Sequence, residues 1–184
     1  MTGPRQSGKT TFLRHELGAG TAYVSLDDPL ERSFAREDPN GFLDRAGDAP
    51  IILDEIQHAP ELLPYLKLRI DRRRQATGRF FLSGSQQFAV MQGVGESLAG
   101  RIAILDLLPF SLGERTDPAR HDLARTIWLG GYPEPLLHPE RRDLWMRSYI
   151  QTYVERDLRQ LRAIGDLRQF ETFLLLAAAR HAQS

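Results

Sequence analysis

The sequence predicts an α/β fold in which a parallel sheet flanked by helices is followed by a helical segment of a second domain. Three observations predict it. Short apolar runs alternate with helical patterns as far as residue 105, which is the order of elements in a parallel sheet. A glycine-rich loop, Gly3 to Thr10, stands directly before the first helical run. Beyond residue 105 only helical patterns remain.

The first elements follow from their start and stop signals. Residues 9–17 form a predicted helix that starts in the glycine-containing loop and is ended by further glycines. Residues 22–26 alternate in polarity and are β-prone, which predicts a strand. Residues 30–36 and 41–46 have the pattern of short polar helices.

Three compact apolar runs predict the other strands. Residues 51–53 form a continuous apolar run that ends in acidic residues, which is typical of a buried parallel strand. A helix over residues 61–74 follows, with leucines at helical spacing. Residues 79–82 and 102–105 are the two remaining strand candidates.

The second part of the chain is predicted to be helical. Residues 109–118 are rich in turn formers and indicate a junction. Helices are expected over residues 121–129 and 141–162, with a turn over residues 130–135 between them. A last helix starts near Leu167. We therefore expect a core domain over residues 1–112, a junction over 113–140 and the incomplete start of a C-terminal helical domain over 141–184.

Composition excludes several classes of protein. The 184 residues hold 24 basic and 24 acidic side chains, so the net charge is zero, which argues against a dedicated electrostatic nucleic-acid binder. The absence of cysteine excludes disulfides, zinc–thiolate sites and cysteine nucleophiles. No apolar run is long enough to span a membrane, and no secretory signal opens the sequence, so a cytoplasmic location is expected.

The glycine-rich loop has the Walker A pattern G-x-x-x-x-G-K-[ST]. Its residues are Gly3, Pro4, Arg5, Gln6, Ser7, Gly8, Lys9 and Thr10. Glycines allow the tight turn that points backbone amides at phosphate oxygens, and the helix that follows adds its positive end. Lys9 would lie across the β- and γ-phosphates of ATP, and Thr10 would give its hydroxyl oxygen to Mg²⁺. The amides of Ser7 and Thr11 would also face the phosphates. The alternative is an ordinary glycine-rich helix start with an exposed lysine.

The run over residues 51–53 ends in Asp54 and Glu55, which is the Walker B pattern. In this pattern the aspartate holds Mg²⁺ through water. The adjacent Glu55 can polarise a water molecule for attack on the γ-phosphate. Phosphotransfer to a substrate hydroxyl does not require such a carboxylate, so Glu55 disfavours a P-loop kinase. The alternative for the pair is a solvated acidic turn.

Two further segments carry polar candidates. Ser83 and Ser85 follow the strand over residues 79–82 and can act as sensors of the γ-phosphate, or simply cap the next helix. Arg101 precedes the predicted strand over residues 102–105. It could contact the γ-phosphate within one chain or across a subunit boundary, although with 22 arginines in the chain a surface role is the default.

Together these motifs resemble one group of AAA+-type prokaryotic ATPases, in which a P-loop NTPase core is fused to a C-terminal helical domain of unknown function. The segments that carry the resemblance are residues 3–11, 53–57, 82–86, 97–101, 107–114, 130–134 and 149–158. The resemblance implies that residues 3–11 bind ATP, that Asp54 serves Mg²⁺ and that Glu55 activates water. It further implies a sensing role for Ser83 or Ser85, and a place for Arg156 and Asp157 at the domain interface.

Two departures from the family pattern predict that the chain is a fragment at both ends. Only Met1 and Thr2 precede Gly3, so the first strand, which normally carries the loop, is missing. Residues 170–177 form an apolar helical stripe with nothing downstream to cover it. Two functions follow as hypotheses. The first is an ATP-binding, Mg²⁺-dependent ATPase that couples hydrolysis to a conformational change. The alternative is a nucleotide-incompetent remnant that acts at most as an interaction module.

Two partners other than nucleotide stay open. A homo-oligomer would allow an arginine to act across a subunit boundary. Nucleic acid would be contacted by the one dense basic stretch, for which a solvated helix end is the alternative. That stretch contains Arg69, Arg72, Arg73, Arg74 and Arg79.

Overall fold

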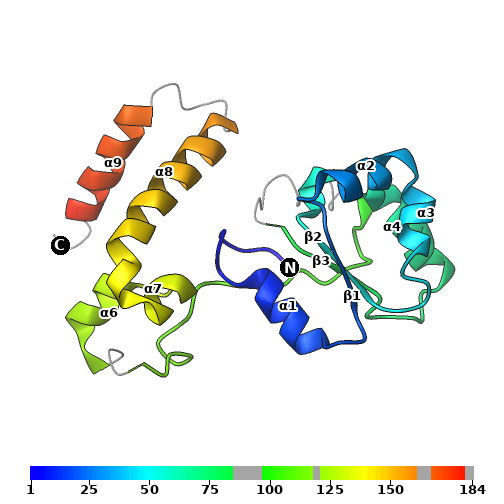
Figure 1. Ribbon diagram of the computed structural model, residues 1–184, viewed down its shortest axis with the longest axis horizontal. Helices are drawn as coiled ribbons and strands as arrows, with labels where there is room; N and C mark the ends of the chain where they lie inside the picture. Colours follow the sequence, from blue (N-terminus) through cyan, green and yellow to red (C-terminus); the bar gives the residue numbers. More distant parts are fainter. Residues whose placement is uncertain (85–96, 118–120, 161–166, 181–184) are drawn as a thin grey trace. The chain divides into compact units, whose positions relative to one another are not determined.

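The computed structural model describes residues 1–84, 97–117, 121–160 and 167–180, and for residues 153–160, 167, 168, 171 and 174 only the backbone. The chain divides into two compact units (Figure 1). Unit 1 comprises Met1–Arg120 with Gly131–Pro133, and unit 2 comprises His121–Gly130 with Glu134–Ser184. The predicted α/β sheet domain and the helical segment after it are thus both present.

Unit 1 is built on a three-stranded parallel sheet in the order β1-β2-β3. The strands are β1 (Ala22–Ser25), β2 (Ile51–Asp54) and β3 (Phe80–Leu82), which confirms three of the four predicted strands. The register aligns Ser25 with Asp54 and Leu53 with Leu82. Because the strands are parallel, their carboxyl ends meet at one edge of the sheet, which is where ligands bind in α/β proteins.

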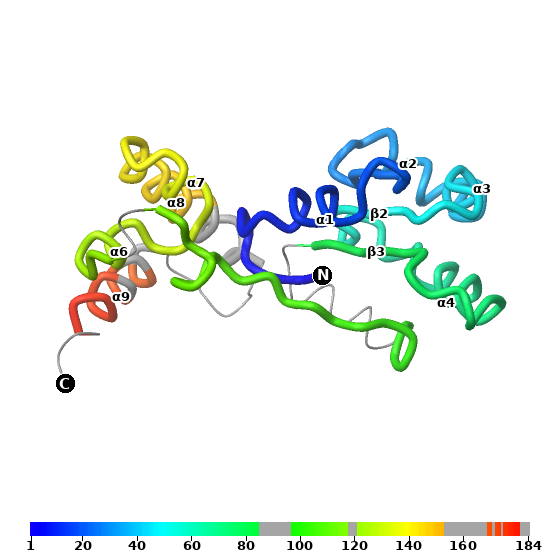
Figure 2. Tube along the Cα trace, turned by 90° about the horizontal axis from the view of Figure 1, so that it is seen from below, coloured from blue at the N-terminus to red at the C-terminus, as the bar shows by residue number. Residues whose placement is uncertain are grey.

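The predicted strand over residues 102–105 is wrong for the structure described. This segment makes only an isolated parallel bridge between Thr2 and Asp106. The Thr2 amide donates to the Leu105 carbonyl at 2.8 Å, and the Met1 amino group donates to Leu82 at 2.6 Å. Met1 and Thr2 therefore lie between the end of β3 and this segment, as Figure 2 shows. A β-ladder requires several consecutive backbone pairs between two strands. Met1 and Thr2 alone are too short for this and form only one bridge.

Among the described residues of unit 1, four α-helices and one 3₁₀ turn accompany the sheet. They are α1 (Lys9–Leu17), α2 (Pro29–Glu37), α3 (Pro39–Asp44), α4 (Leu62–Arg72) and η1 (Ile56–His58). Helices α2 and α3 start earlier than predicted because Asp28 and Asp38 cap them. The Asp28 carboxylate accepts from the Leu30 amide at 2.8 Å, and a proline occupies the first turn of each helix. These aspartate–proline pairs were readable in the sequence.

The side chains of strand β2 alternate between the two faces of the sheet. Ile51 and Leu53 belong to a buried apolar cluster that also holds Phe42 of α3 and Leu66 of α4. Ile52 and Asp54 point to the opposite face because successive side chains of a strand alternate. Helix α1 contacts β2. The acidic end of β2 is therefore presented to the start of α1, which carries the glycine-rich loop.

The regular elements in the described residues of unit 2 are helices. They are α6 (Leu123–Leu129), α7 (Pro133–Leu137), α8 (Arg142–Gln160) and α9 (Leu167–Arg180), with a 3₁₀ turn, η3 (Pro139–Arg141), before α8. Helix α7 falls partly where a turn was predicted over residues 130–135; Pro133 starts it, since proline suits the first helical position. None of the helices in the described part of the chain is both long and apolar enough to cross a bilayer.

Candidate functional site

The glycine-rich loop has the backbone that its sequence requires. Gly3 and Gly8 have φ angles of 135° and 96°, which residues with a side chain rarely adopt. A Cβ atom on Gly3 would clash with the backbone carbonyl of Leu107. Gln6, with φ of 61°, is in the left-handed region without being glycine. Gly8 precedes Lys9, the first residue of α1, so the unpaired amides of the helix start belong to the loop.

Lys9 is folded back over its own loop. Its ammonium donates to the carbonyl oxygens of Gly3 at 3.0 Å and Pro4 at 2.7 Å, and only 6% of the residue is exposed. Burial lowers the pKa of Lys9, while the carboxylates of Glu55 and Asp54 act in the opposite direction. These carboxylates are therefore close enough to stabilise the ammonium charge.

Asp54 is the centre of the polar network at the carboxyl edge of the sheet. Although only 5% of the residue is exposed, its carboxylate accepts four hydrogen bonds. Oδ2 accepts from the Thr10 hydroxyl at 2.7 Å and from the Tyr23 hydroxyl at 3.0 Å. Oδ1 accepts from the Ser83 hydroxyl and from the Glu55 amide, the latter at 3.2 Å. Four donors compensate for the burial of a carboxylate.

The strand register explains how three of these residues meet. Leu53 pairs with Leu82, so the following residues, Asp54 and Ser83, lie side by side. Tyr23 comes from β1, the neighbour of β2 on its other side. Tyr23 is not among the site residues predicted from the sequence. Its position in a strand next to the acidic strand was a usable signal, but only the register brings the hydroxyl to the carboxylate.

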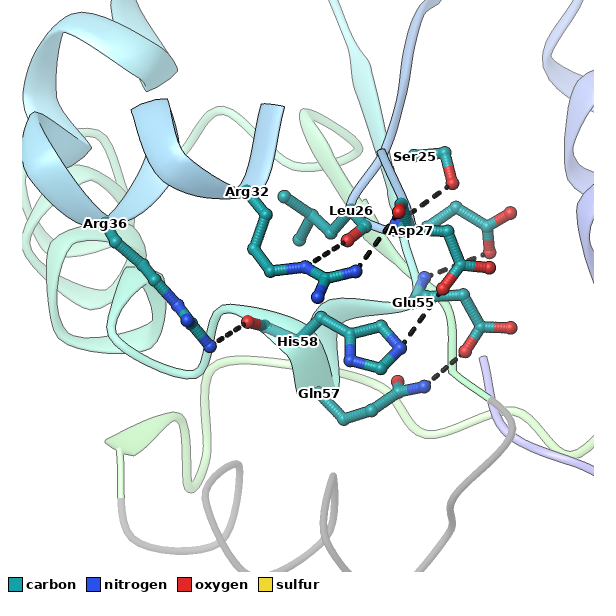
Figure 3. Close-up of polar contacts among 9 residues, drawn as sticks. Ser25, Leu26, Asp27, Arg32, Arg36, Glu55, Gln57 and His58 are labelled. Atoms are coloured by element: carbon teal, nitrogen blue, oxygen red, sulfur yellow. Dashed lines mark hydrogen bonds and ion pairs between the residues drawn. The ribbon is translucent and has the colours of Figure 1, made fainter. Parts of the chain in front are cut away.

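Glu55 is held by a short local structure after β2. Its φ angle of 54° lies in the left-handed region, an uncommon conformation for a residue with a side chain. The Gln57 side-chain amide donates to the Glu55 carboxylate, as Figure 3 shows. The turn η1 begins directly after Glu55. Strained backbone of this kind is concentrated at functional sites.

The same turn is tied to the end of β1 and to α2 (Figure 3). The His58 ring nitrogen Nε2 lies 3.1 Å from Asp27 Oδ1, and Arg36 donates to the His58 carbonyl at 2.7 Å. Arg32 donates to the Leu26 carbonyl at 3.0 Å. These contacts connect the turn that carries Glu55 and Gln57 to neighbouring elements of unit 1.

Of the predicted site residues that the structure describes, Arg101 does not join this network. Ser85 lies outside the described residues. Arg101 pairs with Asp71 of α4: its Nε and a terminal nitrogen lie 2.9 Å and 3.0 Å from the two carboxylate oxygens. Asp71 is at the end of α4, which leads to the start of β3. Arg101 is therefore at the opposite edge of the sheet from Asp54, and it is not brought to the glycine-rich loop of its own chain. The side chains of Arg156 and Asp157 are also outside the described part.

The basic stretch is partly neutralised within unit 1. Four of its five arginines lie within salt-bridge distance of a carboxylate. The pairs are Arg69–Asp44 at 2.8 Å, Arg73–Asp48, Arg74–Asp71 at 3.5 Å and Arg79–Asp48 at 3.4 Å. Asp48 is shared by two of these arginines, and Asp71 also binds Arg101, so positive charge remains in excess. Such pairs are typical of a solvated surface and contribute little to stability.

Comparison with known proteins divides the chain into two consecutive matches. The family model described as an AAA domain matches residues 1–116, and the model of a domain of unknown function (DUF8612) matches residues 120–184. Uncharacterized proteins of Mycobacterium tuberculosis and Mycobacterium bovis are each 34% identical over 167 residues, which cover 88% of this chain and 36% of theirs. The chain thus spans about a third of the length of these relatives.

Proposed function

The chain belongs to the AAA domain family, and from this premise we propose that it binds ATP with Mg²⁺ and hydrolyses it, coupling hydrolysis to a conformational change. The observation that carries the proposal is the hydrogen bond of 2.7 Å from Thr10 to Asp54. It joins the loop expected to bind phosphate to the acid expected to serve the metal. These two residues are 44 positions apart in sequence, so tertiary structure is needed to join them.

The phosphate-binding role is supported by how Lys9 and Ser7 are placed. Lys9 makes two hydrogen bonds to carbonyls of the loop, which phosphate oxygens can replace as stronger, charged acceptors. The Ser7 hydroxyl oxygen is buried and has no hydrogen-bond partner among the described residues. An unsatisfied buried hydroxyl costs free energy, and a phosphate oxygen would satisfy it. The conformational change therefore begins with Lys9, which turns from the loop carbonyls to the phosphates.

The residues present also fit Mg²⁺. The Thr10 hydroxyl and the Asp54 carboxylate are oxygen ligands of the kind that Mg²⁺ prefers. Among the described residues no group of three or more histidine, aspartate or glutamate side chains is suited to hold a metal alone. This agrees with a site that takes its other ligands from phosphate and water, as Mg²⁺ commonly does. When bound, the ion neutralises charge that develops on the phosphates.

Glu55 is the residue that we propose to orient and deprotonate the attacking water. Its carboxylate is held by the Gln57 amide, and its neighbour Asp54 is committed to four donors. Glu55 therefore differs in role from Asp54. Arg101 is not assigned a role within its own chain. Contact across a subunit boundary, nucleic-acid binding and a cytoplasmic location stay predictions, as do the activity and partners of any longer chain.

Isothermal titration of ATP in Mg²⁺ tests the binding step. Lys9→Ala should weaken affinity by about tenfold or more, because charged hydrogen bonds to phosphate are lost. Lys67→Ala is the matched control, since Lys67 is the other lysine of the sequence, and it should leave affinity unchanged. Equal affinity in the wild type and Lys9→Ala, or no binding in either, overturns the proposal.

Phosphate release at saturating ATP tests the hydrolysis step separately. Glu55→Gln should keep the affinity for ATP and lose turnover by about 100-fold or more, because the amide cannot accept the proton. Glu37→Gln, at an exposed position at the end of α2, is the matched control and should retain turnover. Normal turnover of Glu55→Gln would remove Glu55 from the proposed mechanism while leaving nucleotide binding in place.

A further inference from the structure

Tyr23 holds the carboxylate oxygen that faces the phosphate-binding loop. Its hydroxyl donates to Asp54 Oδ2 at 3.0 Å, and the same oxygen accepts the Thr10 hydroxyl at 2.7 Å. Tyr23 is on β1, whereas Asp54 ends β2 and Thr10 is in the first turn of α1. Three elements of unit 1 therefore converge on one oxygen atom.

The phenol ring is in contact with α1 as well, through Arg14. The Arg14 guanidinium lies over the ring at 5.0 Å from its centroid. Arg14 follows Thr10 by four residues in α1, so both side chains are on one face of that helix. An ionised carboxylate can only accept hydrogen bonds, so the Tyr23 hydroxyl is the donor in this contact.

The hydrogen-bonding capacity of Asp54 is fully used in this arrangement. An ionised carboxylate has about four lone-pair positions, and Asp54 accepts four hydrogen bonds. A further donor, such as water carried by a metal ion, must displace one of these. The Glu55 amide is backbone, and Ser83 is only 1% exposed. The Thr10 hydroxyl can keep its hydrogen bond to Asp54 while a lone pair of its oxygen coordinates a metal ion. Tyr23, 37% exposed, is the donor with room to leave.

Resting on the function proposed above, we propose that Tyr23 is a positioning residue that occupies Asp54 Oδ2 in the metal-free protein and withdraws when Mg²⁺ and ATP bind. The Tyr23 hydroxyl and water on the metal ion would thus compete for the same oxygen of the Asp54 carboxylate. The hydroxyl lowers the affinity for Mg²⁺·ATP relative to metal-free ATP, and it keeps Asp54 hydrogen-bonded when no metal is present. Tyr23 thereby sets the Mg²⁺ dependence of nucleotide binding without contacting the nucleotide.

Titration of ATP into the full chain, once in Mg²⁺ and once in EDTA, tests this role. Tyr23→Phe keeps the ring and removes only the hydroxyl. Its affinity for ATP in EDTA should equal that of the wild type, whereas its affinity in Mg²⁺ should rise by about fivefold to tenfold, because a competing hydrogen bond to a charged group is lost. Tyr65→Phe removes a phenol hydroxyl in α4 and should change neither affinity. The inference is overturned if the affinity in Mg²⁺ divided by the affinity in EDTA is the same in Tyr23→Phe as in the wild type, or smaller.

A spectroscopic measurement keeps the test decisive if Tyr23→Phe binds poorly for other reasons. Addition of Mg²⁺ to the wild type with ATP should produce a tyrosine difference absorption near the 280 nm band, because the phenol loses its carboxylate acceptor. The difference should be absent in Tyr23→Phe and present in Tyr65→Phe. A difference of equal size in all three proteins overturns the inference. The proposed function fails by a different result, namely that the wild type binds no ATP or binds it no better than Lys9→Ala does. The two failures are therefore distinguishable.

Discussion

The Ser83 hydroxyl, which follows β3, donates to Asp54 Oδ1 at the end of β2. Both residues are nearly inaccessible, with exposed fractions of 1% and 5%. The contact spans 29 residues of sequence and depends on the parallel register of the two strands. A buried carboxylate relies on each of its donors, so this contact contributes to stability as well as to the shape of the site.

Ser83→Ala should lower the free energy of unfolding by about 1–3 kcal/mol, because a hydrogen bond to a buried charged group is lost. Urea unfolding followed by circular dichroism measures the change. Ser111→Ala is the matched control, since its hydroxyl donates to the exposed Glu114 carboxylate at 2.7 Å. Its effect should stay within about 0.5 kcal/mol. Equal losses in the two variants would contradict the importance assigned to the Ser83 contact.

Gly3→Ala should destabilise unit 1 by about 2–4 kcal/mol, because it combines an unfavourable φ with a clash against the Leu107 carbonyl. Gly47→Ala separates the two causes. Gly47 also has a positive φ, of 57°, but no atom lies within 4 Å of the added Cβ. It should cost only about 1 kcal/mol. Urea midpoints measure both, and similar midpoints would show that the close approach of Leu107 is unimportant.

Lys9→Met should stabilise the nucleotide-free protein at neutral pH while weakening nucleotide binding, as Lys9→Ala does. Burial lowers the pKa of Lys9 in the folded state, so between that pKa and the unfolded value of about 10.4 the unfolded chain binds more protons. The stability of the wild type therefore rises with pH in this window. The gain in free energy of unfolding of Lys9→Met over the wild type should be largest below the pKa of Lys9 in the folded state. It should shrink as the pH approaches about 10.4.

Urea unfolding of both proteins at about pH 7 and about pH 9.5 measures this difference. Lys67→Met is the matched control, because Lys67 is the other lysine of the sequence, and the variant should track the wild type at both pH values. A gap between Lys9→Met and the wild type that grows with pH would contradict the direction of the pKa shift.

Arg101→Ala should change the affinity for Mg²⁺·ATP by less than about twofold, since Arg101 is at the sheet edge opposite Asp54. It should lower the thermal midpoint, as should Asp71→Ala, because each removes one side of a two-point ion pair. In the double variant the two effects should be less than additive. A loss of affinity as large as that of Lys9→Ala would show that Arg101 reaches nucleotide.

The elements of unit 1 were predictable where local signals decide them. The strands at 22–25, 51–54 and 80–82 follow from polarity and apolar runs, and α1 follows from the loop before it and the glycines after it. Helices α2 and α3 start before their predicted positions, because Asp28 and Asp38 cap them and a proline follows each cap. The segment over residues 102–105 has a high strand propensity. A strand also needs a neighbouring strand to pair with, and its own residues do not reveal whether one is present.

The sequence by itself determined the chemistry offered at the site: a glycine loop with Lys9 and Thr10, and a buried strand that ends in Asp54 and Glu55. These are local patterns, in which spacing along the chain dictates backbone conformation and side-chain type. Only the tertiary structure decided that Tyr23 shares an oxygen of Asp54 with Thr10, and that Arg101 is bound to Asp71 instead. The Tyr23 contact spans 31 residues and depends on the parallel register of β1 and β2. The Arg101 contact spans 30 residues and joins a turn to the end of α4. Spacing along the chain dictates neither contact, because each depends on how distant segments pack.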